Sequence, residues 1–240
     1  MEFIDIHSHI LPGVDDGAKD MDETLLMLQM AYQEGIRVMV ATPHYEAGKN
    51  NISIDRLNQL LQEVKQAVKE AGIELKILLG NEILYSISAL EALKEGKVLS
   101  MDGTRYILVE FLPGTSFKQI REGLYSCILA GYIPILAHAE RYECLNKKPM
   151  LVGELRKLGV YIQINLSSIR GKFTNRKVMF CNKILKMKWV HFLGTDAHGA
   201  HERVPRMKEG VELLMKKYGE DTVRQLLWNN PMTMLDNKHL

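Results

Sequence analysis

Short apolar runs alternate along the chain with longer segments in which apolar residues recur at helical spacing. Met21, Leu25, Leu28 and Tyr32, for example, recur at i, i+4, i+7 and i+11 before Gly35, as expected of an amphipathic helix with a glycine at its end. The short runs predict seven strands, at residues 3–6, 38–42, 75–79, 106–110, 133–137, 160–165 and 190–194. Further helices are predicted at residues 57–71, 116–130, 149–158, 175–186 and 206–217. A strand followed by a helix, many times over, predicts a parallel sheet in an α/β fold.

The number of these repeats favours a closed barrel. About seven units of roughly 30 residues suit a (β/α) barrel that is one unit short of eight, and an open doubly wound sheet is the alternative. The 240 residues contain no Gly/Pro/Ser-rich linker, so we expect one domain over residues 1–240. The loop at residues 45–53, rich in Asn and Gly, is a candidate mobile element of the barrel rim.

Composition excludes several classes of protein. The net charge is +2 and the basic residues form no stripe, which argues against a nucleic-acid partner. The three cysteines form no CxxC pair, so neither a disulfide framework nor a thiolate zinc site is indicated. No apolar run approaches the ~18 residues of a membrane helix, so we expect no direct membrane insertion and a cytoplasmic location.

Polar side chains of one chemical kind follow the predicted strands. Six residues lie at or within about three residues of a strand end, namely His7, His44, Glu82, Glu110, His138 and Asp196. A buried strand needs no His or carboxylate for folding. The carboxyl ends of barrel strands share one rim, where barrel enzymes hold their active sites, so we expect these side chains to converge there.

Two short motifs place ligand-type side chains at i and i+2. In the run Asp5-Ile6-His7-Ser8-His9, an extended backbone directs both imidazoles to one side, and Asp196-Ala197-His198 repeats the spacing. The first run is followed by Asp15-Asp16-Gly17. Imidazoles and carboxylates without thiolates suit Zn²⁺, Mn²⁺ or Fe²⁺, and the set is too large for one ion. A site of two or three cations is typical of phosphoester hydrolysis.

The sequence contains no motif for a nucleotide cofactor or for a catalytic cysteine. The chain has no GxxxxGK[ST] or GxGxxG loop and no Cys-x5-Arg phosphate loop. A phosphatase with this sequence would therefore use a water activated by metal ions. His191 lies within a predicted strand and is interpreted as a packing residue, while His201 and His239 are interpreted as rim and tail residues.

Taken together, the motifs resemble a known superfamily. The series DIHSHILPGVDDG, ATPH, GNE, VEF, AHAERY and TDAH is similar to that of the polymerase and histidinol phosphatase (PHP) superfamily, and in particular to the capsule and exopolysaccharide tyrosine-protein phosphatases of Gram-positive bacteria. The resemblance extends from residue 4 to about residue 231. It implies a distorted (β/α)7 TIM-like barrel with three divalent metal ions. The expected metal is Mn²⁺, with Zn²⁺ or Fe²⁺ as alternatives.

The resemblance also implies a role for each motif residue. The first metal would be held by His7, His9, Glu82 and Asp196, the second by Glu82, Glu110 and His138, and the third by Asp16, His44 and His198. Asp15 is an alternative to Asp16. Arg141 and Arg203 match phosphate-binding arginines, whose planar guanidinium suits two phosphoryl oxygens.

The implied substrate is phosphotyrosine on the tail of a cognate bacterial tyrosine kinase that controls polysaccharide synthesis. A small-molecule phosphatase of the histidinol-phosphate type is one alternative. Others are a non-catalytic metal-binding regulator that docks a kinase and a nuclease-like domain attached to a polymerase. The full ligand set argues against an inactive scaffold and the near-neutral charge argues against DNA, while the sequence leaves the oligomeric state open.

Overall fold

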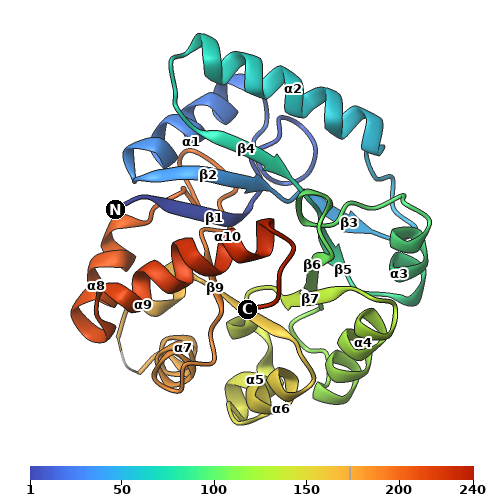
Figure 1. Ribbon diagram of the computed structural model, residues 1–240, viewed down its shortest axis with the longest axis vertical. Coiled ribbons are helices and arrows are strands. Elements are labelled where there is room, and N and C mark those ends of the chain that lie inside the picture. Colours follow the sequence, from blue (N-terminus) through green and yellow to red (C-terminus); the bar gives the residue numbers. More distant parts are fainter. Residues whose placement is uncertain (173) are drawn as a thin grey trace.

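The computed structural model describes residues 1–172 and 174–240, and its strands and helices alternate along the chain (Figure 1). The strands are β1 (Phe3–Ser8), β2 (Ile36–Ala41), β3 (His44–Glu46), β4 (Lys76–Leu79), β5 (Glu82–Leu84), β6 (Tyr106–Glu110), β7 (Ile133–Leu136), β8 (Tyr161–Asn165) and β9 (Phe192–Gly194). The helices are α1 (Met21–Gln33), α2 (Ile54–Glu70), α3 (Ile87–Lys94), α4 (Phe117–Leu129), α5 (Glu143–Lys147), α6 (Leu151–Lys157), α7 (Arg176–Lys186), α8 (Lys208–Tyr218), α9 (Glu220–Arg224) and α10 (Asn230–Leu235).

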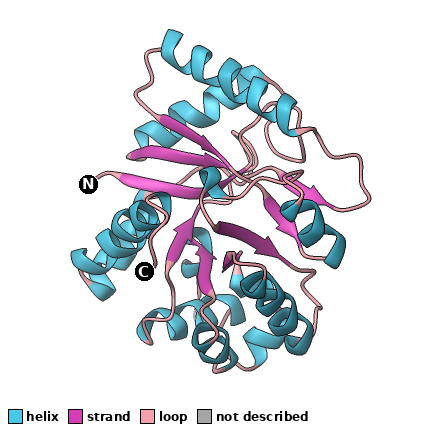
Figure 2. Cartoon of the chain, turned by 45° about the vertical axis from the view of Figure 1, so that its right-hand side comes forward, coloured by secondary structure: helices cyan, strands magenta, loops and turns pink. Residues whose placement is uncertain are grey.

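All strand pairs are parallel, which confirms the predicted α/β fold. The strands form one sheet in the order β1-β2-β4 and a second in the order β3-β5-β6-β7-β8-β9. The helices lie on the outside of the strands (Figure 2). Beyond the ladders, the backbone of Ser8 pairs with Ala197, and the amide of His9 donates to the carbonyl of Ala197 at 2.8 Å. The first strand therefore lies beside the segment that follows the last one.

The seven predicted strands are present, and two of them continue after a short break. β2 stops before Pro43, which has no amide hydrogen for a ladder, and β3 resumes at His44. β4 stops before Gly80 and β5 resumes at Glu82. The buried side chain of Asn81 donates to the carbonyl of Pro43 at 2.9 Å and accepts from the amide of Leu99 at 2.9 Å, so it adds to the main-chain hydrogen bonds that Gly80 and Glu82 form across the break.

The predicted rim loop at residues 45–53 begins as strand, because β3 covers Tyr45 and Glu46. Its remaining backbone is tied by Asn51, whose amide nitrogen donates to the carbonyl of Glu46 at 2.8 Å. Helices α3 and α5 and the C-terminal helices α9 and α10 were not predicted. These are short segments of 8, 5, 5 and 6 residues, so their apolar periodicity covers too few turns to be recognised.

Two apolar clusters sandwich the strands. The larger lies between the strands and the helices, and the smaller includes Ile4, Ile6, Tyr106 and Phe192 from the strands together with Met234 of α10. Helix α10 crosses in front of the strands in Figure 1. Because the hydroxyl of Tyr106 donates to the carbonyl of Lys238 at 2.6 Å, this C-terminal segment is tied to the amino-terminal end of β6.

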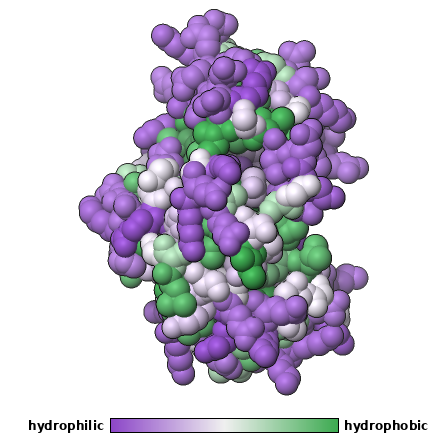
Figure 3. All heavy atoms as spheres, turned by 90° about the vertical axis from the view of Figure 1, so that its right-hand side faces the viewer, coloured by the Kyte–Doolittle hydropathy of each residue, from purple (hydrophilic) through white to green (hydrophobic). Residues whose placement is uncertain are grey.

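The side turned to the viewer in Figure 3 is largely hydrophilic, with apolar patches between charged groups. The longest helix, α2, has 17 residues, and within residues 1–172 and 174–240 no helix combines the length and the apolar character needed to cross a membrane.

Candidate metal centre and phosphate site

The carboxyl ends of the strands bring all nine predicted ligands into one cluster. Ligand atoms within 4.8 Å of one another form three groups: His7, His9, Glu82 and Asp196; His9, Asp16, His44 and His198; and His44, Glu82 and Glu110. His138 lies against the third group, since its Nε2 is 2.7 Å from Oε1 of Glu82. The predicted convergence is therefore present, and the role of these residues as metal ligands stays a prediction.

The first group has the spacing of ligands around one ion. His7 Nε2 lies 3.1 Å from Glu82 Oε2 and 3.5 Å from Asp196 Oδ1, and the corresponding distances from His9 Nε2 are 3.2 and 3.7 Å. The two Nε2 atoms are 3.3 Å apart. Ligand atoms about 2.1 Å from a common ion would be roughly 3.0 Å apart at a right angle and roughly 3.4 Å apart at a tetrahedral angle. These four side chains therefore fit a divalent cation.

Two buried carboxylate oxygens in this group lack a hydrogen bond. Oε2 of Glu82 and Oδ1 of Asp196 have no hydrogen-bond partner among the residues that the structure describes. Ring nitrogens of His7, His9 and His44 lie 3.1–3.2 Å from that Glu82 oxygen. A buried anionic oxygen without a donor is costly, and a cation between it and the imidazoles would remove the cost. The donor set thus fits metal ions, with Glu82 placed to bridge two of them.

The group around Asp16 distinguishes the two adjacent aspartates. Oδ1 of Asp16 lies 3.3 Å from Nε2 of His44 and 3.4 Å from Nε2 of His198. The carboxylate of Asp15 instead lies 2.7 Å from Nδ1 of His9 and accepts from the amides of His44 and Gly17, each at 3.0 Å. The geometry therefore favours Asp16 as the ligand, with Asp15 orienting a neighbouring imidazole.

The glycine of this motif has a packing reason. A Cβ atom at Gly17 would lie 2.1 Å from the carbonyl oxygen of His9, which is far inside contact distance. Any larger residue would push the Asp15-Asp16 turn away from the histidines. The glycine of the Asp-Asp-Gly run thus allows both carboxylates to lie close to the end of β1.

The remaining group joins Glu82, Glu110 and two imidazoles. His138 Nε2 lies 3.4 Å from Oε2 of Glu110, and His44 Nδ1 lies 3.2 Å from its Oε1. His138 thus contacts Glu82 and Glu110, the two carboxylates that the resemblance places with it at the second metal. His44 also lies within ligand distance of them, so it faces both this group and the group around Asp16.

Electrostatics in the protein alone favour the protonated forms of His9 and His138, whereas burial and the neighbouring His9 lower the pKa of His198 to about 4. Burial lowers the pKa of His9, but the carboxylates of Asp15 and Glu82 outweigh burial and raise this pKa to about 10. Burial also lowers the pKa of His138, but the carboxylates of Glu82 and Glu110 outweigh burial and raise this pKa to about 9. The cluster therefore attracts positive charge, and a metal ion that binds there must displace protons from these rings.

The two oxygens of Asp196 face different partners. Oδ1 points to the imidazoles of the first group, while Oδ2 is 2.8 Å from Nη2 of Arg203 and in contact with Nη2 of Arg141. The side-chain amide of Asn165 donates to the same Oδ2 at 2.6 Å. Both predicted phosphate-binding arginines therefore lie beside the cluster and reach it through one carboxylate.

Local backbone strain coincides with this site. His138, Asp196 and Arg203 have φ values of 31°, 53° and 49°, a region that non-glycine residues seldom adopt. They are three of the six such residues in the described chain. Strain of this kind persists where surrounding contacts impose it, and it is concentrated at functional sites.

A cavity of about 210 Å³ opens beside the arginines. Its lining includes Arg141, Arg203 and Asp196, together with Ser167, Ser168 and Lys177. The last three were not identified from the sequence, because Ser167 and Ser168 follow a strand end but are not His or carboxylate residues, and Lys177 lies in a predicted helix. The cavity has the charge and size for a phosphate group.

Two buried polar residues behind the cluster were also not assigned a role. Oδ1 of Asp5 accepts from the amides of His7 at 3.2 Å and Thr195 at 3.0 Å, which ties the two His-containing motifs together. Oε1 of Gln163 accepts from the amide of His138 at 2.6 Å and lies 3.4 Å from Nδ1 of His7. The sequence signal would have been a polar side chain in an otherwise apolar strand.

The histidines predicted to lie outside the site do so. Nδ1 of His191 accepts from the amide of Ile162 at 2.9 Å, and its ring packs on Tyr161 with 4.9 Å between centroids. His201 and His239 are exposed. His191 is therefore a hydrogen-bonded packing residue, as predicted.

The family model for capsular polysaccharide synthesis proteins, CpsB/CapC, matches residues 3–236. The chain belongs to the CpsB/CapC family. Among its relatives, the tyrosine-protein phosphatase CpsB of Streptococcus pneumoniae is 34% identical over 237 residues, which cover 97% of this chain and 98% of that protein.

Solved structures agree with this membership. A chain from the crystal structures of YwqE from Bacillus subtilis and CpsB from Streptococcus pneumoniae, described as metal-dependent tyrosine phosphatases, superimposes with a TM-score of 0.90 at 31% identity and covers 98% of this chain and 95% of that one. A phosphotriesterase homology protein from Escherichia coli has a TM-score of 0.60 at 13% identity, with coverage of 96% and 97%, and shares the fold alone. The CpsB/CapC membership thus extends over nearly the whole chain.

Proposed function

We propose that this protein is a metal-dependent protein-tyrosine phosphatase. The observation that carries the proposal is the placement of Arg141 and Arg203 on one oxygen of Asp196, while the other oxygen faces the imidazole and carboxylate cluster. This arrangement puts phosphate-binding groups next to a site for divalent cations. The relatives named as tyrosine-protein phosphatases support the reaction.

The metal complement belongs to the same proposal. His7, His9, Glu82 and Asp196 would hold one ion, Glu82, Glu110 and His138 a second, and Asp16, His44 and His198 a third. We favour Mn²⁺, with Zn²⁺ or Fe²⁺ as alternatives, because all donors are nitrogen or oxygen. When bound, the cations would activate a water molecule and neutralise charge on the phosphoryl oxygens.

The chain itself would bind and orient the phosphate. Each guanidinium offers two parallel N–H donors to phosphoryl oxygens, and the contacts of Arg141 and Arg203 with Asp196 hold both groups near the cavity. A tyrosine leaving group has a pKa of about 10, so its departure needs little help from a protein acid. Binding, orientation and charge neutralisation are therefore sufficient roles for these residues.

The same proposal covers the architecture and the cellular substrate. We infer a single domain over residues 1–240 that closes as a distorted (β/α)7 barrel, supported by the parallel strand order and by the Ser8–Ala197 bridge between the first strand and the end of the last.

We propose that the substrate is a phosphotyrosine-bearing tail of a bacterial tyrosine kinase in capsule or exopolysaccharide synthesis. The family's connection with capsular polysaccharide synthesis supports this substrate.

A substrate panel tests the proposal. Purified protein, with its metal content counted by elemental analysis, would be assayed with a phosphotyrosine peptide, a phosphoserine peptide and histidinol phosphate. We expect the highest kcat/KM with the phosphotyrosine peptide and no turnover after chelation. A preference for histidinol phosphate would instead identify a small-molecule phosphatase, and metal binding without turnover of any substrate would identify a non-catalytic regulator.

A further inference from the structure

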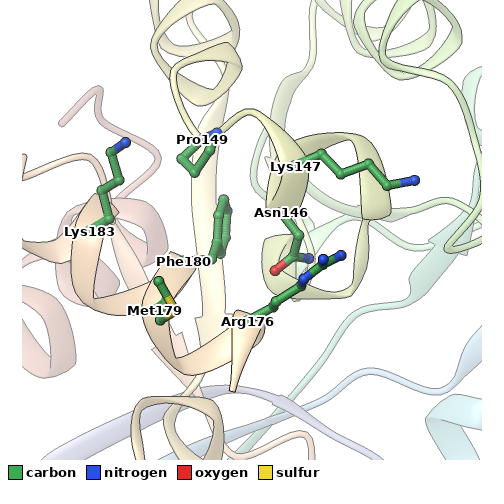
Figure 4. A pocket seen from close by; sticks show the side chains of 7 residues that line it. All are labelled: Asn146, Lys147, Pro149, Arg176, Met179, Phe180 and Lys183. Atoms are coloured by element: carbon green, nitrogen blue, oxygen red, sulfur yellow. The ribbon is translucent and has the colours of Figure 1, made fainter. Parts of the chain in front are cut away.

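A basic pocket lies between helices α5 and α7, away from the metal cluster. Its volume is about 420 Å³, and Figure 4 shows its lining. Lys147, Arg176 and Lys183 contribute the cationic groups, and Pro149, Met179 and Phe180 contribute the apolar wall. The lining contains no Asp or Glu. The pocket therefore combines positive charge with an apolar surface.

Helix α7 presents one face to this pocket. Arg176, Met179, Phe180 and Lys183 stand at i, i+3, i+4 and i+7, so their side chains share a stripe of the helix. Phe180 is buried and forms the floor, whereas Met179 is 54% exposed. An aliphatic side chain of this size on the surface offers contact area to a partner.

Two of the cations are not neutralised within the protein. Lys147 pairs with Glu143 at 3.0 Å, but within residues 1–172 and 174–240 neither Arg176 nor Lys183 forms an ion pair with a carboxylate. Both side chains are exposed. Unpaired cations around an apolar floor attract anionic partners.

The pocket adjoins the phosphate cavity, although the two share no lining residue. Arg176 lines the pocket, and the next residue, Lys177, lines the cavity that also contains Arg141 and Asp196. Asn146, which lines the pocket in Figure 4, donates at 2.6 Å to the carbonyl of Glu140, a residue that lines the cavity. A chain that enters the cavity with its phosphate can thus continue along basic residues into the pocket.

The geometry points to a docking site for the substrate peptide, and we propose that this pocket binds acidic residues that flank the phosphotyrosine. The proposal rests on the proposed phosphatase function and adds a preference in sequence context. The charged groups would attract Asp or Glu side chains, and the apolar wall would receive the aliphatic parts of the same segment. Charge complementarity and proximity to the phosphate cavity select an acidic peptide over an apolar partner.

The test compares two phosphotyrosine peptides of equal length, one with Glu on both sides of the phosphotyrosine and one with Gln at the same positions. For the unaltered protein at low ionic strength we expect kcat/KM to be about tenfold higher with the Glu peptide, mainly through KM, and this ratio should shrink in 0.5 M salt. In the variant Arg176→Ala/Lys183→Ala the ratio should fall to about one to two. Hydrolysis of p-nitrophenyl phosphate, which has no flanking residues, should stay unchanged.

A matched control removes the same charge elsewhere. Lys69 and Lys76 are exposed and lie in α2 and at the start of β4, so Lys69→Ala/Lys76→Ala should keep the ratio of the unaltered protein. The idea is overturned if the unaltered protein treats both peptides alike, or if the control lowers the ratio as much as the pocket variant. Failure to hydrolyse any phosphotyrosine substrate would instead overturn the proposed function. In that case fluorescence anisotropy with a labelled Glu peptide still decides the docking site, because equal affinity for the unaltered protein and the pocket variant contradicts it.

Discussion

The carboxylate of Asp15 lies 2.7 Å from Nδ1 of His9 and directs the opposite ring nitrogen, Nε2, towards Glu82 and Asp196. The same carboxylate oxygen accepts from the amide of His44 at 3.0 Å. Burial opposes ionisation of Asp15, but His9 outweighs burial and lowers the pKa of this carboxyl to about 2. A carboxylate behind a ligand histidine fixes the orientation of the ring and makes its free nitrogen a better donor.

We therefore expect Asp15→Ala to weaken metal binding by about 10- to 100-fold without removing any ligand. Asp15→Asn keeps an oxygen that can accept from Nδ1, so its effect should be smaller. Competition with a chromogenic chelator measures the affinity. Asp22→Ala, at an exposed position of α1, serves as control. Unchanged affinity in Asp15→Ala would show that His9 is held by its other contacts.

Arg141→Ala should separate substrate binding from metal binding. The arginine contacts Oδ2 of Asp196, whereas Oδ1 faces the imidazoles, so the metal content should stay unchanged. Loss of one charged partner of a phosphate should lower kcat/KM by about 30- to 1,000-fold, or roughly 2–4 kcal/mol. Steady-state kinetics on a phosphotyrosine peptide and elemental analysis of the same preparation would measure both effects.

Two further variants sharpen the assignment of Arg141. Arg141→Lys should recover only part of the loss, because an ammonium group cannot reproduce a planar fork. Arg203→Ala should be less damaging, since Arg203 is 42% exposed against 32% for Arg141 and screening by solvent weakens its contact. Loss of metal from Arg141→Ala, or full activity in it, would contradict the phosphate-binding role.

Chelation and thiol alkylation should have opposite consequences. Burial raises the pKa of Cys127 to about 12 and also raises the pKa values of Cys144 and Cys181, so their unreactive thiol forms predominate near pH 7.5. A chelator should abolish phosphatase activity, and Mn²⁺ should restore it. Treatment with iodoacetamide under native conditions should leave activity largely intact. Inactivation by iodoacetamide with full metal content would contradict a metal-dependent mechanism.

His191 should make stability depend on pH. Burial, helped by Arg156, lowers the pKa of His191 from 6.5 to about 4, so the unfolded chain binds a proton at a higher pH than the folded one. The stabilising contribution is therefore present above pH 6.5 and is lost as the pH falls towards 4. We expect a loss of about 1–2 kcal/mol in unfolding free energy between pH 7 and pH 5 from this residue.

The variant His191→Asn isolates this contribution, because its side-chain oxygen can accept from the amide of Ile162 as Nδ1 does. Urea unfolding of the unaltered protein and the variant at both pH values gives the difference between them, and effects common to both proteins cancel. His239→Asn, at an exposed position near the C-terminus, is the matched control. An equal pH dependence in the unaltered protein and His191→Asn would exclude His191 as its source.

The alternation of apolar runs and amphipathic segments was sufficient to predict a parallel α/β fold, because each strand must be buried between helices. The same pattern located His7, Glu82, His138 and Asp196, since a His or carboxylate at the end of a buried strand has no local reason to be there. Convergence of these residues followed from the parallel topology alone. These inferences needed only periodicity and position, both of which are properties of the sequence.

Only the tertiary structure decided which atoms meet. Asp15 and Asp16 are adjacent and chemically identical, and they differ because one packs on His9 while the other faces His44 and His198. Ser167, Ser168 and Lys177 reach the arginines only through the packing of distant segments. Hydrogen bonds such as that between Gln163 and His138 join positions 25 residues apart. Such contacts depend on distances across the fold, which local periodicity does not encode.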